Sequence, residues 1–144
     1  MAHWDTSALL KLFLAEADSS AFAALAAVGS TPVTAFIARY EAHAAFLRRE
    51  GEGALIEGEA DLLYLDLLAD FANEDIVEVS LTPALEAEYD EVLRNCLLYS
   101  PPVFVRTNDA LHLAAARLAG EKVFISADRR QRAAAEHLGF TVLP

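Results

Sequence analysis

The sequence has a single cysteine, few lysines and no long apolar run. Because Cys96 is the only cysteine in 144 residues, an intramolecular disulfide and a zinc site made of several cysteines are both excluded. No apolar stretch reaches the roughly 18 residues that a membrane span requires, and the first residues lack the charged and apolar regions of a signal peptide. We therefore expect a soluble cytoplasmic protein in which Cys96 is a small core residue.

Positive charge is scarce as well, because 11 basic residues face 22 acidic ones and give a net charge of −11. This balance argues against a non-specific nucleic-acid binder, whose affinity depends on neutralising phosphates. It leaves room for a local basic groove, and Arg129, Arg130 and Arg132 cluster near the C-terminus. The forked guanidinium group suits phosphate, so these arginines are candidate phosphate contacts. A solvated first helical turn is the alternative.

Apolar residues, in contrast, are abundant: they make up 55% of the chain, and the mean hydropathy is +0.28. The length fits one domain over residues 1–144 with a sizeable core. An apolar fraction of 55% is high for a soluble protein of this size. An interface with a second subunit or another partner is the natural place to bury the excess.

Extended and helical segments alternate along the chain, as judged from apolar periodicity, glycine and proline breaks and capping residues. The extended segments are 2–5, 31–33, 76–79, 123–125 and 140–142, and the helices are 8–16, 19–28, 35–50, 59–71, 82–98, 108–120 and 128–138. This alternation predicts an α/β fold with a parallel sheet of four to five strands flanked by helices on both faces. Ligand sites in such sheets lie beyond the carboxyl ends of the strands.

Three aspartates fall where a parallel sheet places its ligands. Asp5 ends the first extended segment, and Asp128 follows shortly after the apolar segment 123–125. Both are therefore expected at the carboxyl edge of the sheet. Asp109 begins a helix that is apolar on nearly every side, so we expect that helix to be buried and its first-turn carboxylate to face an interior cleft.

Glu41 is expected on a long helix, beside an apolar stripe. The stripe follows the spacing of successive helical turns and consists of Phe36, Ile37, Tyr40, Ala44 and Leu47. An acid that borders a core face needs a partner or a metal ion. The alternative is an ion pair with Arg48 on the same flank of the helix.

The aspartates have structural alternatives too. Asp5 can cap the helix that follows it, and Asp109 and Asp128 can be first-turn acids favoured by the helix dipole. If the four carboxylates converge, however, they cannot all stay ionised without a cation. Carboxylate oxygens, with a hydroxyl such as that of Ser126 nearby, suit Mg²⁺ or Mn²⁺ rather than zinc.

Four segments taken together resemble one protein family. They are Asp5-Thr6-Ser7-Ala8-Leu9, Glu41 on its helix, Arg106-Thr107-Asn108-Asp109-Ala110-Leu111-His112-Leu113-Ala114, and Ser126-Ala127-Asp128. In this order they resemble the PIN domain, and most nearly the VapC-type toxins of bacterial toxin–antitoxin pairs. The resemblance extends over nearly the whole chain and is most specific from residue 108 to residue 142.

The resemblance implies a PIN-like fold and an Mg²⁺- or Mn²⁺-dependent endoribonuclease. The residues that it implies as metal-holding and catalytic are Asp5, Glu41, Asp109 and Asp128. Thr6 and Ser126 are expected to support them. The implied partners are RNA as substrate, an antitoxin peptide and a second copy of the chain in a homodimer. The helices around Glu41 and over residues 61–71 are candidate antitoxin-facing surfaces.

The expected chemistry is hydrolysis by metal-activated water, since a metal ion polarises a phosphodiester oxygen and lowers the pKa of a bound water. Glu41 is expected to hold a second metal ion or to orient that water. His112 is expected either to orient Asp109, one turn before it, or to pack in the core. Two other functions stay open, a catalytically idle interaction module of the same fold and a hydrolase of another phosphate ester. The presence of all four acids favours catalysis.

Overall fold

Five short strands form one sheet, in which every neighbouring pair is parallel. The computed structural model describes all residues from 1 to 144. The strands are β1 (Ala2–Trp4), β2 (Val33–Ala35), β3 (Val77–Val79), β4 (Val123–Ile125) and β5 (Thr141–Leu143). They are arranged in the order β3-β2-β1-β4-β5. The predicted parallel sheet is therefore confirmed, and it has five strands.

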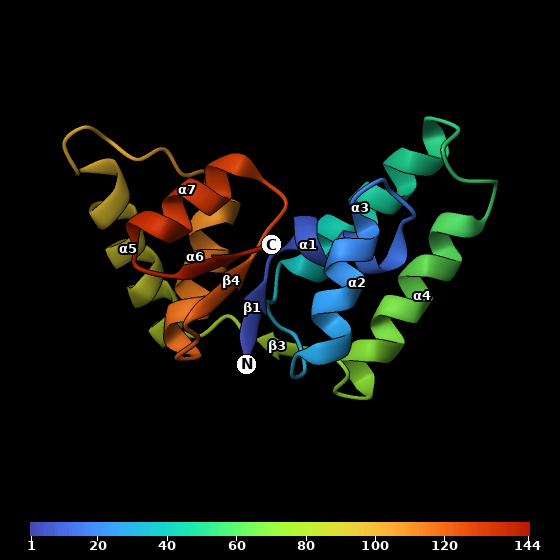
Figure 1. Cartoon of the computed structure of the whole chain (residues 1–144), viewed down its shortest axis with the longest axis horizontal. Helices are drawn as coiled ribbons and strands as arrows, with labels where there is room; N and C mark the ends of the chain where they lie inside the picture. The colour runs from blue at the N-terminus through green and yellow to red at the C-terminus, as the bar shows by residue number, and fades with distance from the viewer.

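Seven helices cover the two faces of this sheet, as predicted (Figure 1). One layer contains α1 (Thr6–Phe13), α2 (Ser19–Val28), α3 (Ala38–Gly51) and α4 (Glu59–Ala72), and the other contains α5 (Pro83–Leu97), α6 (Thr107–Leu118) and α7 (Arg129–His137). Each layer has a buried apolar cluster of its own against the sheet. None of the seven helices combines the length and the apolar character needed to cross a membrane.

Successive residues of the central strand point into different layers, because side chains alternate along a strand. Trp4 packs near Phe22 of α2, with the ring centroids 6.4 Å apart. His3 stacks on Phe124 of β4 at 5.1 Å, on the side of α5, α6 and α7. Full burial of one large apolar side chain is worth about 1.5–3 kcal/mol, so these contacts fix β1 firmly between the layers.

Local signals in the sequence account for several helix ends. Thr82 caps α5 by accepting a hydrogen bond from the backbone N–H of Leu85 at 3.2 Å, and Pro83 fills the first helical position, where its missing N–H costs nothing. Gly120 and Gly139 follow α6 and α7 with φ values of 73° and 90°, which favour glycine. The chain thereby turns sharply from each helix into the next strand.

The position of β1 determines where a site forms. From β1 the chain continues to β2 on one side, and from the neighbouring strand β4 it continues to β5 on the other side. Trp4 pairs with Ile125 at the carboxyl ends of β1 and β4. The residues that directly follow, Asp5 and Ser126, therefore emerge side by side at a topological switch point, where open α/β sheets bind ligands.

One prediction about α3 is wrong. Tyr40 and Leu47, two members of the predicted apolar stripe, have exposed fractions of 64% and 46%. The buried face of the helix consists instead of Ala38, Ala42, Ala45 and Phe46. The helix begins at Ala38, so Phe36 and Ile37 precede it, and the face that is buried is mostly alanine and was not marked by large apolar side chains.

Cys96 is fully buried in α5, as predicted. It belongs to the apolar cluster under α5, α6 and α7, and burial raises the pKa of its thiol. A thiol that is buried and harder to ionise is a poor nucleophile. The residue therefore contributes packing.

Candidate active site

The four acids predicted from the sequence line one small cavity at the carboxyl edge of the sheet. The cavity has a volume of about 80 Å³ and no apolar side chain in its wall; it is lined by Asp5, Thr6, Ser7, Glu41, Arg106, Asp109, His112 and Asp128. These residues come from α1, α3 and α6, together with the N-cap residues of α1, α6 and α7. The structure thus brings together side chains that lie more than 100 residues apart in the chain.

Asp5 is the most enclosed of the acids, with an exposed fraction of 4%. One carboxylate oxygen, Oδ1, accepts hydrogen bonds from the Ser7 hydroxyl at 2.6 Å and the Ala8 N–H at 3.0 Å, while Oδ2 accepts from the Ser126 hydroxyl at 2.5 Å. Burial raises the pKa of Asp5, against the opposing effects of His112 and of these donors. Asp5 therefore caps α1, as the structural alternative predicts, and also faces the cavity.

Glu41 is held by hydrogen bonds rather than by the expected neighbours on its own helix. Its Oε1 accepts from the Thr6 hydroxyl at 2.7 Å and from Nε2 of His112 at 2.9 Å, and its Oε2 accepts from the Asn108 amide at 3.3 Å. Burial by itself raises the pKa of Glu41, but the hydrogen bonds and charge of these partners outweigh it and lower the pKa. No ion pair joins Glu41 to Arg48.

Asp109 and Asp128 form the more open side of the cavity, with side-chain exposed fractions of 14% and 34%. Asp128 caps α7, since its Oδ1 accepts from the backbone N–H groups of Arg130 at 2.8 Å and Gln131 at 3.1 Å. Asp109 lies in the first turn of α6, and its carboxylate accepts a hydrogen bond from the backbone N–H of the N-cap residue Arg106 at 3.1 Å. Both aspartates thus fulfil the structural alternative and still border the cavity.

Arg106 supplies a positive charge between these two aspartates. Its Nε lies 3.2 Å from Oδ2 of Asp109, and its Nη2 lies 3.7 Å from Oδ2 of Asp128. The hydrogen bond and charge of Asp109, joined by the charges of Asp128 and Glu41, raise the pKa of Arg106. The sequence prediction missed this role, although an arginine three residues before a helix-opening aspartate is the spacing of a side-chain pair on one turn.

The oxygen donors suit a hard divalent cation, but the carboxylates are not gathered around one point. No three Asp, Glu, His or Cys side chains are arranged as a ready coordination site. The reason is local, because Asp128 is turned toward its own helix and Asp109 toward Arg106. The donor set therefore fits Mg²⁺ or Mn²⁺ in its chemistry. Arg106 occupies Oδ2 of Asp109, so it competes with an ion for that oxygen and leaves Oδ1 uncommitted.

Hydroxyl groups join the acids into one network. Ser126 is fully buried and accepts from the Asp128 N–H at 3.0 Å while it donates to Asp5. Ser7, which the sequence did not single out as a site residue, donates to Asp5 and accepts from the Ala127 N–H at 2.9 Å. Thr6 and Ser126 thus both contact predicted site carboxylates. The D-T-S run after a strand was the signal that placed Ser7 here.

The three C-terminal arginines have different surroundings. Arg132 donates to the backbone carbonyls of Ser126 at 2.9 Å and Pro144 at 2.7 Å, which ties it to the structure beside the site. The Arg130 guanidinium lies 5.6 Å from the centroid of the Phe104 ring. Arg129 is exposed and makes no ion pair. Contact between these residues and RNA stays a prediction.

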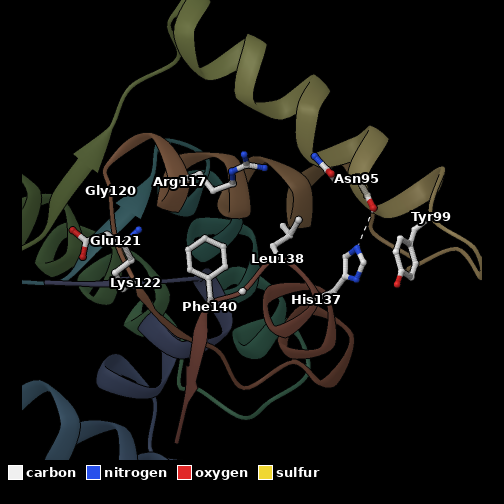
Figure 2. Close-up of a pocket in the computed structure, with 10 residues that line it drawn as sticks. Asn95, Tyr99, Arg117, Gly120, Glu121, Lys122, His137, Leu138 and Phe140 are labelled. Atoms are coloured by element: carbon white, nitrogen blue, oxygen red, sulfur yellow. Dashed lines mark hydrogen bonds between the residues drawn. The ribbon is translucent and has the colours of Figure 1, made fainter.

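A larger cavity of about 510 Å³ lies at the opposite edge of the sheet, where Lys122 and Phe140 precede β4 and β5 (Figure 2). Its polar groups contact other parts of the protein. His137 Nε2 lies 3.0 Å from the backbone carbonyl of Asn95, as the dashed line in Figure 2 marks, and Arg117 pairs with Glu88 at 3.2 Å. It contains none of the four acids, so the smaller cavity is the candidate for chemistry.

Comparison with known proteins identifies the fold and the family. A sequence model of the PIN domain matches residues 4–137, almost the whole chain. The chain belongs to the PIN domain family. No curated protein sequence matches it. The matched region contains all four acids of this PIN domain.

Solved structures share this PIN fold at low sequence identity. VapC20 of Mycobacterium tuberculosis, a sarcin–ricin loop cleaving toxin, has a TM-score of 0.71 at 19% identity, covering 93% of this chain and 95% of that one. A toxin–antitoxin complex from Klebsiella pneumoniae has a TM-score of 0.62 at 15% identity, covering 100% and 97%. FitAcB from Neisseria gonorrhoeae has a TM-score of 0.72 at 14% identity, covering 100% and 97%.

Proposed function

We propose that this PIN domain is a metal-dependent endoribonuclease and the toxin of a toxin–antitoxin pair. The observation that carries the proposal is the convergence of Asp5, Glu41, Asp109 and Asp128 on one cavity with an entirely polar wall. The cavity lies at the topological switch point of a PIN-family chain. Structures of the same fold include a toxin that cleaves the sarcin–ricin loop and a toxin–antitoxin complex, which favour this activity over other phosphate-ester chemistry.

Asp5, Asp109 and Asp128 are the residues that would hold Mg²⁺ or Mn²⁺, with Glu41 beside them. When bound, the ion supplies charge that polarises the phosphodiester and lowers the pKa of an attacking water. Asp5 enters the reaction already oriented, because three donors fix both of its oxygens. Such prior orientation avoids reorganisation at the moment of reaction.

Glu41 is the residue that would orient the attacking water. Its Oε1 is occupied by Thr6 and His112, whereas Oε2 has only one long hydrogen bond, 3.3 Å from Asn108. Oε2 is therefore the atom available to accept a hydrogen bond from water. The lowered pKa of Glu41 keeps it ionised at neutral pH and makes it a weak base, which suits orienting the water rather than taking its proton.

The proposed partners are an antitoxin peptide and a second copy of the chain. Exposed apolar side chains on α3 and α4 support an interface there; they are Tyr40, Leu47, Leu62 and Leu65. Side chains of this kind gathered on neighbouring helices are typical of surfaces that bind other proteins. Light scattering on the purified chain tests the homodimer, and co-expression with a candidate antitoxin tests the peptide partner.

The decisive experiment measures RNA cleavage by the purified protein with Mg²⁺, with Mn²⁺ and with EDTA. Asp5→Asn and Asp109→Asn variants are run in parallel, with Asp66→Asn as the control because Asp66 is exposed on α4. We expect cleavage that needs a divalent ion, is lost in the two site variants and is kept in the control. Cleavage that persists in EDTA or in both site variants would overturn the mechanism.

The same assay separates the two alternatives. Hydrolysis of a chromogenic phosphodiester without any RNA cleavage would favour a hydrolase of another phosphate ester. If neither substrate reacts and calorimetry detects no Mn²⁺ binding at millimolar concentration, the interaction-module interpretation takes its place.

A further inference from the structure

Two buried histidines connect Glu41 with the interior of the sheet. His112 lies in α6 and His3 in β1, with exposed fractions of 3% and 0%. Nε2 of His3 is 3.2 Å from Nδ1 of His112, and Nε2 of His112 is 2.9 Å from Oε1 of Glu41. The three side chains therefore form a continuous hydrogen-bonded chain that leads from the core to the candidate active site.

The position of the proton on His112 follows from its partners. An ionised carboxylate only accepts hydrogen bonds, so the contact with Glu41 requires hydrogen on Nε2 of His112. Thr6, whose hydroxyl oxygen is 3.1 Å from the same Nε2, uses its own hydrogen in the bond to Glu41. It therefore acts on His112 as an acceptor as well. Both contacts place the proton on Nε2.

The proton on His3 is placed by a group that lacks a partner. Nδ1 of His3 is buried and makes no hydrogen bond. A hydrogen on that atom would be a buried donor without an acceptor, which is costly. A histidine ring without a hydrogen on Nδ1 is neutral. Its one proton is then on Nε2 and is donated to Nδ1 of His112.

We propose that His3 and His112 are positioning residues, which form a one-directional relay that fixes Oε1 of Glu41 and leaves Oε2, with its single long hydrogen bond from Asn108, to contact the reacting water. The inference rests on the proposed nuclease function, because it assigns the relay to that reaction. Groups that hydrogen-bond to the ligands of a metal ion orient those ligands, and losing such a partner typically costs about 10- to 100-fold in metal affinity or activity.

A packing role makes a different prediction from a positioning role. Packing depends on volume and on the stacking of His3 against Phe124, whose rings are 19° from parallel. Positioning depends on a donor at one atom of His112. Glutamine and asparagine separate the two roles, because the glutamine amide reaches close to the place of Nε2 while the asparagine amide reaches only the place of Nδ1.

The first test compares His112→Gln with His112→Asn in RNA cleavage, with thermal unfolding as a check of the fold. We expect His112→Gln to keep kcat within a few-fold of the wild type. His112→Asn is expected to lower kcat by about 10- to 100-fold with little change in KM. Equal values of kcat for the two folded variants would overturn the positioning role.

The second test does not depend on activity or on either variant folding. Nitrogen–proton correlation spectra of the metal-free wild type report which ring nitrogen of each histidine bears hydrogen. We expect hydrogen on Nε2 of both His3 and His112. Hydrogen on Nδ1 of either ring would overturn the relay. If the wild type cleaves no RNA while the spectra match, the proposed function fails and the hydrogen-bonded relay still stands as a structural feature.

Discussion

The two sides of the candidate site are built in different ways. Asp5 and Glu41, the inner pair, receive hydroxyl, imidazole or amide donors from side chains that are distant in sequence. Asp109 and Asp128, the outer pair, are held by the first turns of their own helices and by Arg106. The inner pair is thus fixed by tertiary packing and the outer pair by local structure. We infer that the inner pair sets the geometry of the site and that the outer pair adapts to what binds.

The largest expected effect comes from the inner pair. Asp5→Asn should lower RNA cleavage by at least about 100-fold, since loss of a mere partner of a metal ligand costs up to that factor. The metal-free variant should be at least as stable as the wild type, because asparagine also caps helices and carries no buried charge. Rate measurements and thermal unfolding in EDTA test both halves of this prediction.

Asp109→Asn makes the same substitution in the outer pair, so its effect on metal-free stability can be compared with that of Asp5→Asn. We expect a smaller gain in metal-free stability there, since Asp109 is more exposed and has Arg106 as a counterion. A larger gain at Asp109 than at Asp5 would contradict the interpretation that the buried charge of Asp5 is costly and that of Asp109 is compensated by Arg106.

Removal of one donor to the inner pair should have the next largest effect. Ser126→Ala deletes the 2.5 Å hydrogen bond to Asp5 and leaves the Asp128 N–H without its acceptor. We expect about a tenfold fall in kcat, the lower end of what partners of ligands contribute. Ser20→Ala, at an exposed position in α2, is the control. An unchanged kcat for Ser126→Ala would mean that Asp5 is oriented without this hydroxyl.

Arg106→Leu tests the outer pair. Without the guanidinium, Asp109 and Asp128 have no internal cation, and the affinity for Mn²⁺ measured by calorimetry should rise. The gain should be about fivefold or less, because an exposed ion pair is worth about 1 kcal/mol at most. Arg94→Leu, which removes a similarly exposed arginine from its ion pair with Asp90, is the matched control and should leave the affinity unchanged. Weaker Mn²⁺ binding by Arg106→Leu would contradict the idea that Arg106 competes with the metal ion for the carboxylates of Asp109 and Asp128.

The smallest effect concerns pH and separates Asp5 from Glu41. The pKa of Asp5 is raised on folding, so the folded state binds more protons between 3.8 and the folded pKa, and wild-type stability falls as pH rises through that window. Glu41 has a lowered pKa, so its stabilisation is present above 4.5 and is lost as pH falls through the folded pKa. In EDTA, Asp5→Asn should therefore gain less unfolding free energy over the wild type as the pH becomes more acidic. Glu41→Gln, which is expected to be less stable than the wild type near neutral pH, should likewise differ less from it at acid pH. Chemical unfolding at a series of pH values measures both.

The fold was largely predictable because its signals are local. Apolar segments, the Thr82-Pro83 start and the glycines after α6 and α7 define elements through backbone sterics and capping. The buried face of α3 was not predictable in the same way. Three of its four buried residues are alanines, which carry little periodic signal, whereas the larger Tyr40 and Leu47 lie on the exposed face.

The candidate site divides along the same line. Asp5, Asp109 and Asp128 could be located because their positions follow from strand ends and helix starts. The partners of Glu41 could not, since its contact with His112 joins residues that are 71 positions apart and depends on how α3 and α6 meet. One of the two expectations for His112 was a role beside Asp109, but its hydrogen bond goes to Glu41, and the side chain is buried as the other expectation has it. Arg106 was missed because the direction of a long flexible side chain is set by charges that converge only in the folded chain.

The two buried apolar clusters on either side of the sheet bear on how the protein loses activity. Glu41 belongs to the layer of α1–α4, whereas His112, Asp109 and Asp128 belong to the layer of α5–α7 (Figure 1). The site therefore exists only while both layers stay docked on the sheet. Partial unfolding of either layer, even with the other intact, dissolves it. Activity should disappear at or before the first step of unfolding, which makes cleavage a sensitive measure of the integrity of the whole chain.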